Sequence, residues 1–111
     1  IENIVVLGEN QKYAGAIIVP DFAFLKTWCQ KHEIQFTTPK EMINNIEVKR
    51  RYAEEVKKIN QNFGDTEKIK RYELIADEWS VNNGILTPTL KVKRNVVKEA
   101  YKDLIEMMYK D

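Results

Sequence analysis

The chain has 111 residues, which is the size of one small domain. Apolar residues make up 43% and charged residues 32%, a composition that is typical of a folded globular domain and excludes a disordered chain. Lysine and arginine total 18 against 17 acidic residues, so the bulk charge gives no reason to expect nucleic acid or an anionic membrane as a partner.

The cysteine content indicates the redox compartment of the chain, and its first residues indicate how it relates to a longer protein. Cys29 is the only cysteine, which excludes an internal disulfide and fits a reducing compartment such as the cytoplasm. No run of about 20 apolar residues is present, so we expect no transmembrane helix. The chain begins with Ile1 rather than methionine, and an apolar run starts already at Ile4. We therefore interpret residues 1–111 as one domain cut from a longer protein.

Two apolar runs near the start predict a β-hairpin. The runs cover residues 4–7 and 13–19, and the polar residues 8–11 between them are typical of a turn. Pro20 ends the second run, and Asp21 after it is suited to capping a helix over residues 21–31.

Two more helices are predicted next. Thr38 can cap a short helix, with Pro39 at its first position and Glu41 three residues after the cap. A longer amphipathic helix follows, and we expect Gly64 to end it at the C′ position. Its apolar stripe consists of Val48, Tyr52, Val56, Ile59 and Phe63.

The last third of the chain contains a strand, a loop and a helix. Residues 69–76 predict the strand, and residues 82–84 form a turn that tolerates a positive φ. Pro88 excludes a helix through residues 85–94, which we expect to be an extended loop or short strand. Residues 95–110 predict a final helix. The order predicts a small α+β domain, a mixed sheet with an N-terminal hairpin, flanked by helices.

The segment 82–94 is the hardest to explain by packing alone. Lys91 stands between Leu90 and Val92, so in an extended chain its side chain would face away from theirs. Pro88 stiffens the loop, and a lysine held in this way is a compact positive charge suited to phosphate or carboxylate oxygens. The alternative interpretation of Lys91 is an ordinary solvated surface lysine.

The same segment carries a resemblance to a known family. Residues 84–94 read Gly-Ile-Leu-Thr-Pro-Thr-Leu-Lys-Val-Lys-Arg, which resembles the C-terminal lysine motif of long-chain fatty-acid–CoA ligases, adenylate-forming (AMP-binding) enzymes. By this resemblance Lys91 is the catalytic lysine. Leu90 stands where the wider family has glycine, which marks the long-chain branch. Residues that support the motif are Thr87, Pro88, Thr89 and Arg94.

The resemblance extends over the chain. Residues 16–20, Ala-Ile-Ile-Val-Pro, are similar to the end of the family's hairpin, and residues 1–3 are similar to the end of the helix before it. The resemblance therefore implies that residues 1–111 are the C-terminal lid subdomain of such a ligase, with the family's α+β fold.

The family resemblance also implies a reaction for the whole enzyme. A fatty acid and ATP with Mg²⁺ give an acyl-adenylate and pyrophosphate, and CoA then displaces AMP to form the thioester. In the first pose of the subdomain, Lys91 reaches the carboxylate and the α-phosphate; in the second it withdraws. The implied partner is the missing N-terminal adenylation domain. We expect a cytoplasmic location, with peripheral membrane contact left open, and a fragment that is inactive alone and binds no cofactor.

Other interpretations stay open beside this one. The alternative from another class is a non-enzymatic α+β module that binds a protein partner. A luciferase-like or aryl ligase is a third option, and Leu90 in place of glycine argues against it. For Lys93 and Arg94 we favour solvated charges at a helix start over contacts with CoA phosphates or the large domain. We interpret Cys29 as a packed thiol, and His32 has no neighbour at metal-ligand spacing.

Overall fold

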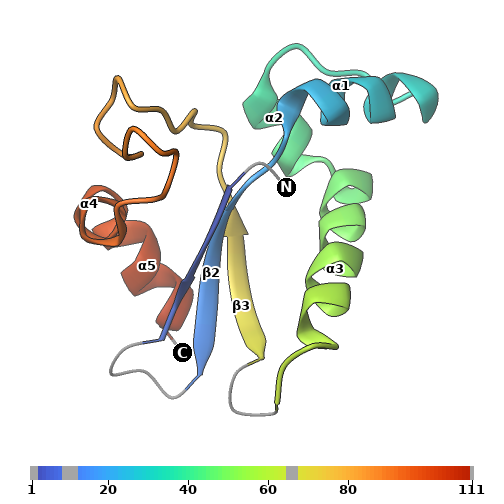
Figure 1. The fold of residues 1–111 in the computed structure, drawn as a ribbon. Helices are drawn as coiled ribbons and strands as arrows, with labels where there is room; N and C mark the ends of the chain where they lie inside the picture. Colours follow the sequence, from blue (N-terminus) through green and yellow to red (C-terminus); the bar gives the residue numbers. More distant parts are fainter. Residues whose placement is uncertain (1–2, 9–12, 65–67, 111) are drawn as a thin grey trace.

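A three-stranded mixed sheet forms the middle of the computed structural model, which describes residues 3–8, 13–64 and 68–110. The strand order is β1-β2-β3, with β1 antiparallel and β3 parallel to β2. Figure 1 shows α3 on one face of the sheet and α4 and α5 on the other. The predicted fold class, a small mixed sheet flanked by helices, is confirmed. The strands are β1 (Asn3–Leu7), β2 (Ala14–Val19) and β3 (Ile69–Leu74).

The N-terminal hairpin is confirmed, with one correction. β1 and β2 pair in the predicted order, and Ile4 lies opposite Ile18. Asn3 pairs with Val19 at the start of β1, so it is not the end of a helix as the family resemblance suggested. Extended pairing satisfies its backbone groups within the sheet. Residues 1–2 and the predicted turn residues 9–11 lie outside the described part of the chain.

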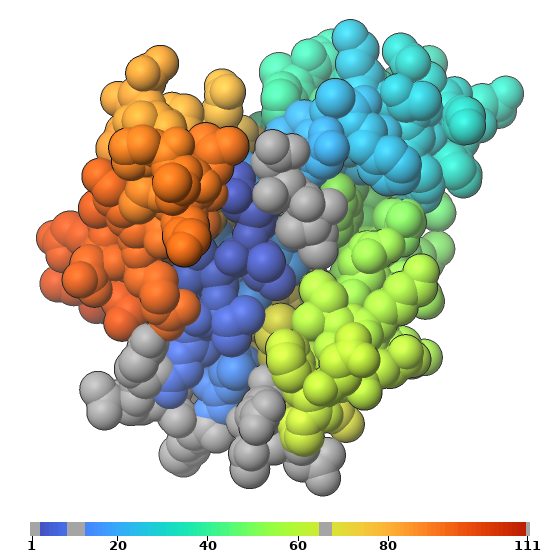
Figure 2. Space-filling view, in the orientation of Figure 1, coloured from blue at the N-terminus to red at the C-terminus, as the bar shows by residue number. Residues whose placement is uncertain are grey.

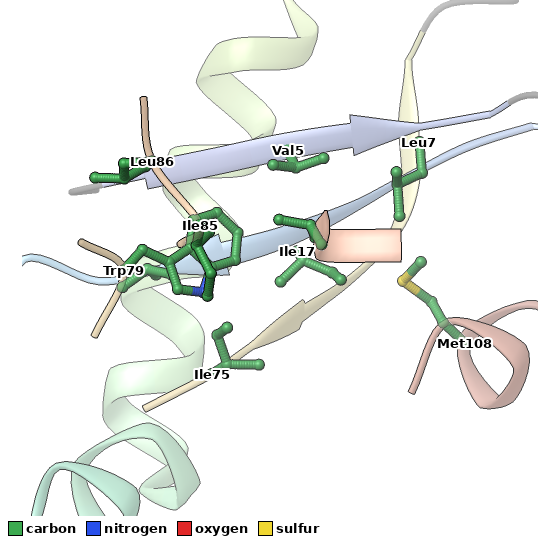
Figure 3. Packing of buried hydrophobic residues seen from close by; sticks show 10 residues of the cluster. Val5, Leu7, Ile17, Ile75, Trp79, Ile85, Leu86 and Met108 are labelled. Atoms are coloured by element: carbon green, nitrogen blue, oxygen red, sulfur yellow. The ribbon is translucent and has the colours of Figure 1, made fainter. Parts of the chain in front are cut away.

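The central strand β2 is buried on both faces. Ala16 and Ile18 face a cluster on the α3 side, whereas Ile17 and Val19 face a cluster on the α5 side. Covering on both faces explains why β2 is a continuous apolar run rather than an alternating one. Figure 3 shows Ile17 among labelled side chains of the α5-side cluster.

The predicted caps of the first two helices are confirmed. The Asp21 side chain accepts a hydrogen bond from the Phe24 amide at 3.2 Å, and the Thr38 hydroxyl accepts one from the Glu41 amide at 3.2 Å. Each cap satisfies an amide that the helix leaves unpaired. The Glu41 carboxylate accepts hydrogen bonds from the amide and hydroxyl of Thr37, rather than from the N-cap residue Thr38. The helices are α1 (Phe22–Lys31) and α2 (Pro39–Asn44).

The third helix, α3 (Ile46–Asn60), ends earlier than predicted. Its C-cap is Gln61, and Gly64 has no positive φ, so the expectation that Gly64 occupies the C′ position is wrong. The Asn60 side chain pairs with the backbone of Ile69, donating to its carbonyl at 2.9 Å and accepting from its amide at 2.8 Å. This pairing turns the chain into β3 and leaves Phe63, 36% exposed, beyond the helix.

The predicted strand 69–76 is β3, which is shorter and contains a bulge. Ile69 pairs with Ala14, and Arg71 pairs with Gly15, so Lys70 is an extra residue between the two pairs. The bulge turns Ile69 into the α3-side cluster, which Tyr72 and Leu74 also contact, as expected for two residues on one face.

The predicted final helix is divided into two. α4 (Arg94–Ala100) and α5 (Lys102–Tyr109) meet at Tyr101, whose φ is −113° and ψ 26°. Tyr101 keeps a backbone hydrogen bond on each side of the break: its amide donates to the Val97 carbonyl, and its carbonyl accepts from the Ile105 amide, at 2.9 Å each. The Tyr101 hydroxyl is held from outside the helix by Trp79 and Asp77, so a distant contact fixes the side chain at the kink.

The helix α5 is clamped onto the sheet at its C-terminal end. Arg71 donates to the carbonyls of Met108 at 2.8 Å and Lys110 at 2.9 Å, which places a cation at the negative end of the helix. The Tyr109 hydroxyl donates to the Leu7 carbonyl at 3.0 Å. Gly15 lies beneath α5, where an added Cβ would be 2.7 Å from Met108 Cε and 2.8 Å from Tyr109 Oη.

Gly15→Ala is expected to lower the free energy of unfolding by about 1–3 kcal/mol, because the methyl group must displace the ends of the Met108 and Tyr109 side chains that pack α5 on the sheet. Gly64→Ala is the matched control, since nothing lies within 4 Å of its added Cβ, and it should stay within about 0.5 kcal/mol of the parent. Urea unfolding followed by circular dichroism measures both, and equal stabilities would contradict this packing of α5.

Burial of the Tyr52 hydroxyl predicts a loss of stability at alkaline pH. Burial raises its pKa from 10.0 to about 12 in the folded state. The folded state therefore holds this proton where the unfolded state has released it. The contribution is fully present below about pH 10 and is lost as the pH rises towards about 12. In urea titrations at about pH 8 and about pH 11, Tyr52→Phe should lose less stability between the two than the parent. An equal loss would contradict the assignment.

Candidate functional site

The segment with the predicted lysine is a tight hairpin. Leu86 and Val92 form an antiparallel bridge, and the Thr87 amide donates to the Lys91 carbonyl at 2.8 Å. The Leu90 amide donates to the Thr87 carbonyl at 2.8 Å, which closes a four-residue β-turn. The ends of the segment are extended as predicted, but its tip is a turn. We call residues 87–91 the lysine turn.

The threonines and the proline of the motif build this turn. Pro88 stands at the second position, where its fixed φ suits the turn. The Thr87 hydroxyl accepts a hydrogen bond from the Lys91 amide at 3.1 Å and lies 3.1 Å from the Thr89 hydroxyl. These contacts constrain the backbone directly before the Lys91 side chain.

Leu90 departs from the predicted alternation. Its φ is +64°, and its side chain is 65% exposed, so it does not point inward with Val92 as a residue in an extended chain would. A left-handed conformation costs a residue with a Cβ about 1–2 kcal/mol, whereas glycine adopts it readily. A glycine at position 90 would therefore adopt this backbone without strain. The φ of Gly84 is +81°, which agrees with the turn predicted over residues 82–84.

The base of the lysine turn is anchored in the core. Ile85 and Leu86 are buried in the α5-side cluster, where Figure 3 shows them beside Trp79. The Lys93 amide donates to the Ile85 carbonyl at 2.8 Å, and the Leu86 amide donates to the Ser80 carbonyl at 3.0 Å. The turn is therefore a projection on a rigid base.

Three long-range hydrogen bonds that the sequence analysis missed hold this base. Arg94 donates to the Val6 carbonyl at 2.6 Å. Figure 2 shows β1, an edge strand, at the surface between α3 and the C-terminal segment. The Trp79 indole donates to the Tyr101 hydroxyl at 3.0 Å, which donates to Asp77 at 2.8 Å. No periodicity or spacing indicates any of these three hydrogen bonds, because their partners are 88, 22 and 24 residues apart.

Lys91 itself is exposed at the end of the turn. Among the described residues, no hydrogen-bonding or ion-pair partner holds its ammonium group. Such an ammonium can approach an anionic group on another molecule or domain without first breaking an internal ion pair. Lys93 is exposed two residues further along, at the cap of α4.

The two other side chains that the sequence analysis weighed are structural. Cys29 is fully buried in the α3-side cluster, and burial raises the pKa of its thiol, so a packed thiol is confirmed. The His32 ring stacks on Trp28 with centroids 4.2 Å apart, and its Nδ1 lies 2.9 Å from the Trp28 carbonyl oxygen. Within the described ranges, no three or more His, Cys, Asp or Glu side chains gather as a metal site would require.

The described surface also has a hollow away from the lysine turn. Its volume is about 400 Å³, and it lies beyond the ends of β2 and β3, with Pro20, Phe22, Pro39 and Trp79 in its wall. No residue of the lysine turn lines it. In the part of the chain that the structure describes, every helix is too short or too polar to cross a bilayer.

Curated relatives align along the chain. It is 33% identical to long-chain-fatty-acid–CoA ligase 6 and 30% identical to long-chain-fatty-acid–CoA ligase 1, both from Homo sapiens. Each alignment covers 98% of this chain but only 16% of the ligase. The chain is also 29% identical to the chloroplastic long-chain-fatty-acid–[acyl-carrier-protein] ligase AEE15 of Arabidopsis thaliana, of which it covers 13%. The chain thus spans about one sixth of the length of the human ligases.

Solved structures share the fold. One is the A-PCP didomain of carboxylic acid reductase from Segniliparus rugosus in complex with AMP, with a TM-score of 0.69 and 23% identity over 96% of this chain and 13% of that one. Another is the adenylation domain of the carboxylate reductase from Mycobacterium chelonae, with a TM-score of 0.65 and 20% identity over 98% of this chain and 15% of that one.

The family model described as "AMP-binding enzyme C-terminal domain" matches residues 1–111. The match covers the three-stranded sheet and the lysine turn as well as the helices, and it agrees with the resemblance of residues 84–94. The chain therefore belongs to the family of AMP-binding enzyme C-terminal domains.

Proposed function

We propose that this chain is the C-terminal lid subdomain of a long-chain fatty-acid–CoA ligase and supplies the lysine for adenylation. The observation that carries the proposal is the exposed Lys91 ammonium at the end of a rigid turn, in a chain 33% identical to a human ligase of this kind. The whole enzyme would convert a fatty acid, ATP and CoA into acyl-CoA, AMP and pyrophosphate. A non-enzymatic interaction module is the less favoured alternative.

The proposed reaction has two steps. A fatty-acid carboxylate oxygen attacks the α-phosphorus of ATP. The phosphoanhydride bond between the α- and β-phosphates breaks, and pyrophosphate leaves. The thiol of CoA, losing its proton, then attacks the acyl carbon, and AMP leaves. The N-terminal domain, which this chain does not contain, would hold the acyl chain and the adenine.

Lys91 acts in the first step. Negative charge builds on the oxygens around phosphorus while the carboxylate approaches. An ammonium held beside both groups stabilises this charge in the transition state. The turn supports this role because the Lys91 backbone is already ordered by Thr87, so only the freedom of the side chain remains to be lost when it reaches its target. In the thioester step the lysine would move away, together with the whole subdomain.

Mg²⁺ would accompany ATP in the full enzyme. Among the described residues, no group of three or more His, Cys, Asp or Glu side chains could hold the ion. We therefore assign no metal-binding role to the residues of this subdomain. The buried single thiol of Cys29 supports a reducing, cytoplasmic setting for the enzyme. A lipid substrate supports a peripheral contact with membranes.

In the full-length enzyme, Lys91→Ala should slow acyl-adenylate formation by about 10²–10³-fold, as the loss of one transition-state contact commonly does. Thioester formation from supplied acyl-adenylate should be largely spared, because the lysine is not used there. Lys93→Ala is the matched control: the same charge is removed two residues away, and adenylation should change less than about threefold. Pyrophosphate release and thioester formation are measured separately, and equal loss in both half-reactions for Lys91→Ala would contradict the role.

A second substitution tests whether the turn, and not the charge alone, matters. Thr87→Val removes the hydroxyl that orders the Lys91 backbone, so adenylation by the full-length enzyme should fall by about fivefold, the effect of one hydrogen bond. Thr87→Ser keeps the hydroxyl and should stay near the parent rate. If valine and serine give the same kcat for pyrophosphate release, the turn does not position the lysine.

A further inference from the structure

We propose that Leu90 is a positioning residue, whose side chain packs into an apolar recess on the N-terminal domain of the same enzyme when Lys91 enters the adenylation site. The proposal rests on the proposed function, because it assigns the surface that guides this lysine. It concerns the side chain of Leu90 and commits to one occupant, the large domain that completes the enzyme.

The first observation is that the turn uses only the backbone of Leu90. Its amide donates to the Thr87 carbonyl, whereas its side chain belongs to neither core cluster and is 65% exposed. Exposed apolar side chains scattered over a surface are ordinary. Leu90 differs because it stands at the tip of a projecting turn, next to the lysine that the turn presents.

The second observation is the conformation in which Leu90 is kept. Its φ of +64° lies in the left-handed region, where glycine would make the same backbone hydrogen bond without strain. The leucine side chain thus makes this backbone conformation less favourable, and it adds nothing to the core of this subdomain. We infer that its benefit arises in a contact outside the subdomain.

The position of Leu90 in the chain selects the occupant. Consecutive Cα atoms are about 3.8 Å apart, so Leu90 comes close to the opening of any pocket that the Lys91 side chain enters. By the proposed function this pocket belongs to the N-terminal domain. The length of the relatives leaves room for it, because this chain covers only 16% of the human ligase 6.

Burial of the leucine would favour one pose of the subdomain. A contact made only when Lys91 is inserted shifts the population towards the adenylating pose and leaves the thioester pose unaffected. Burying a leucine side chain corresponds to roughly a ten- to hundredfold shift in such an equilibrium. The loss should fall on kcat of adenylation rather than on the KM for ATP, because the contact forms after the substrates are bound.

The test uses Leu90→Gly and Leu90→Met in the full-length enzyme. Glycine keeps the left-handed backbone and removes the side chain, so kcat for pyrophosphate release should fall by about tenfold or more, with thioester formation from supplied acyl-adenylate unchanged. Methionine keeps an apolar side chain and should stay within about threefold of the parent. Met107→Ala is the control, because Met107 is 70% exposed on α5, away from the turn.

Several outcomes would overturn the proposal. Adenylation by Leu90→Gly at or above the parent rate would do so, as would equal losses in both half-reactions. A change in dimer fraction, or in binding to phosphatidylcholine vesicles, with adenylation intact would show another occupant. Lys91→Ala separates the two ideas: if it abolishes adenylation while Leu90→Gly does not, the ligase role stands and the docking role falls. If Lys91→Ala spares adenylation, the proposed function itself is wrong.

Discussion

Burial of the chain directly before the lysine turn is the constraint on which the rest of the site depends. Ile85 and Leu86 are held in the α5-side cluster, so the chain can leave the core only as a short projection. A turn on a flexible base would have to become ordered when it met a substrate, which costs entropy. The clamp of Arg71 on α5 and the kink at Tyr101 matter because they hold the helices that form the floor of this cluster.

Features set by neighbours in the sequence could be predicted. Asp21 and Thr38 cap helices because their side chains reach amides three residues away, and no distant contact is needed. The end of α3 and the kink at Tyr101 could not be predicted, because each depends on partners far along the chain. A periodic apolar pattern continues through both places, so the pattern alone predicts helices that are too long.

The candidate site divides in the same way. Lys91 is proposed from the motif, and its role stays a prediction, whereas the stiffening by Pro88 follows from its chemistry and agrees with its place in the turn. The left-handed φ of Leu90 was missed, because leucine gives no signal for a conformation that glycine usually adopts. The bond from Arg94 to Val6 was also missed, since only the folded chain brings residues 88 positions apart together. Its guanidinium faces the backbone of this domain, which a charge pattern cannot distinguish from a solvated arginine.

The same bond from Arg94 to Val6 has a mechanical consequence. It fastens the first strand to the start of α4, while Leu86 and Val92 fasten the lysine turn to the core just before it. The start of α4 and the lysine turn before it are therefore tied both to β1 and to the core of the same subdomain. If the sheet turns as one body, the lysine turn has to turn with it, because its two ends are fixed to that sheet and to its core.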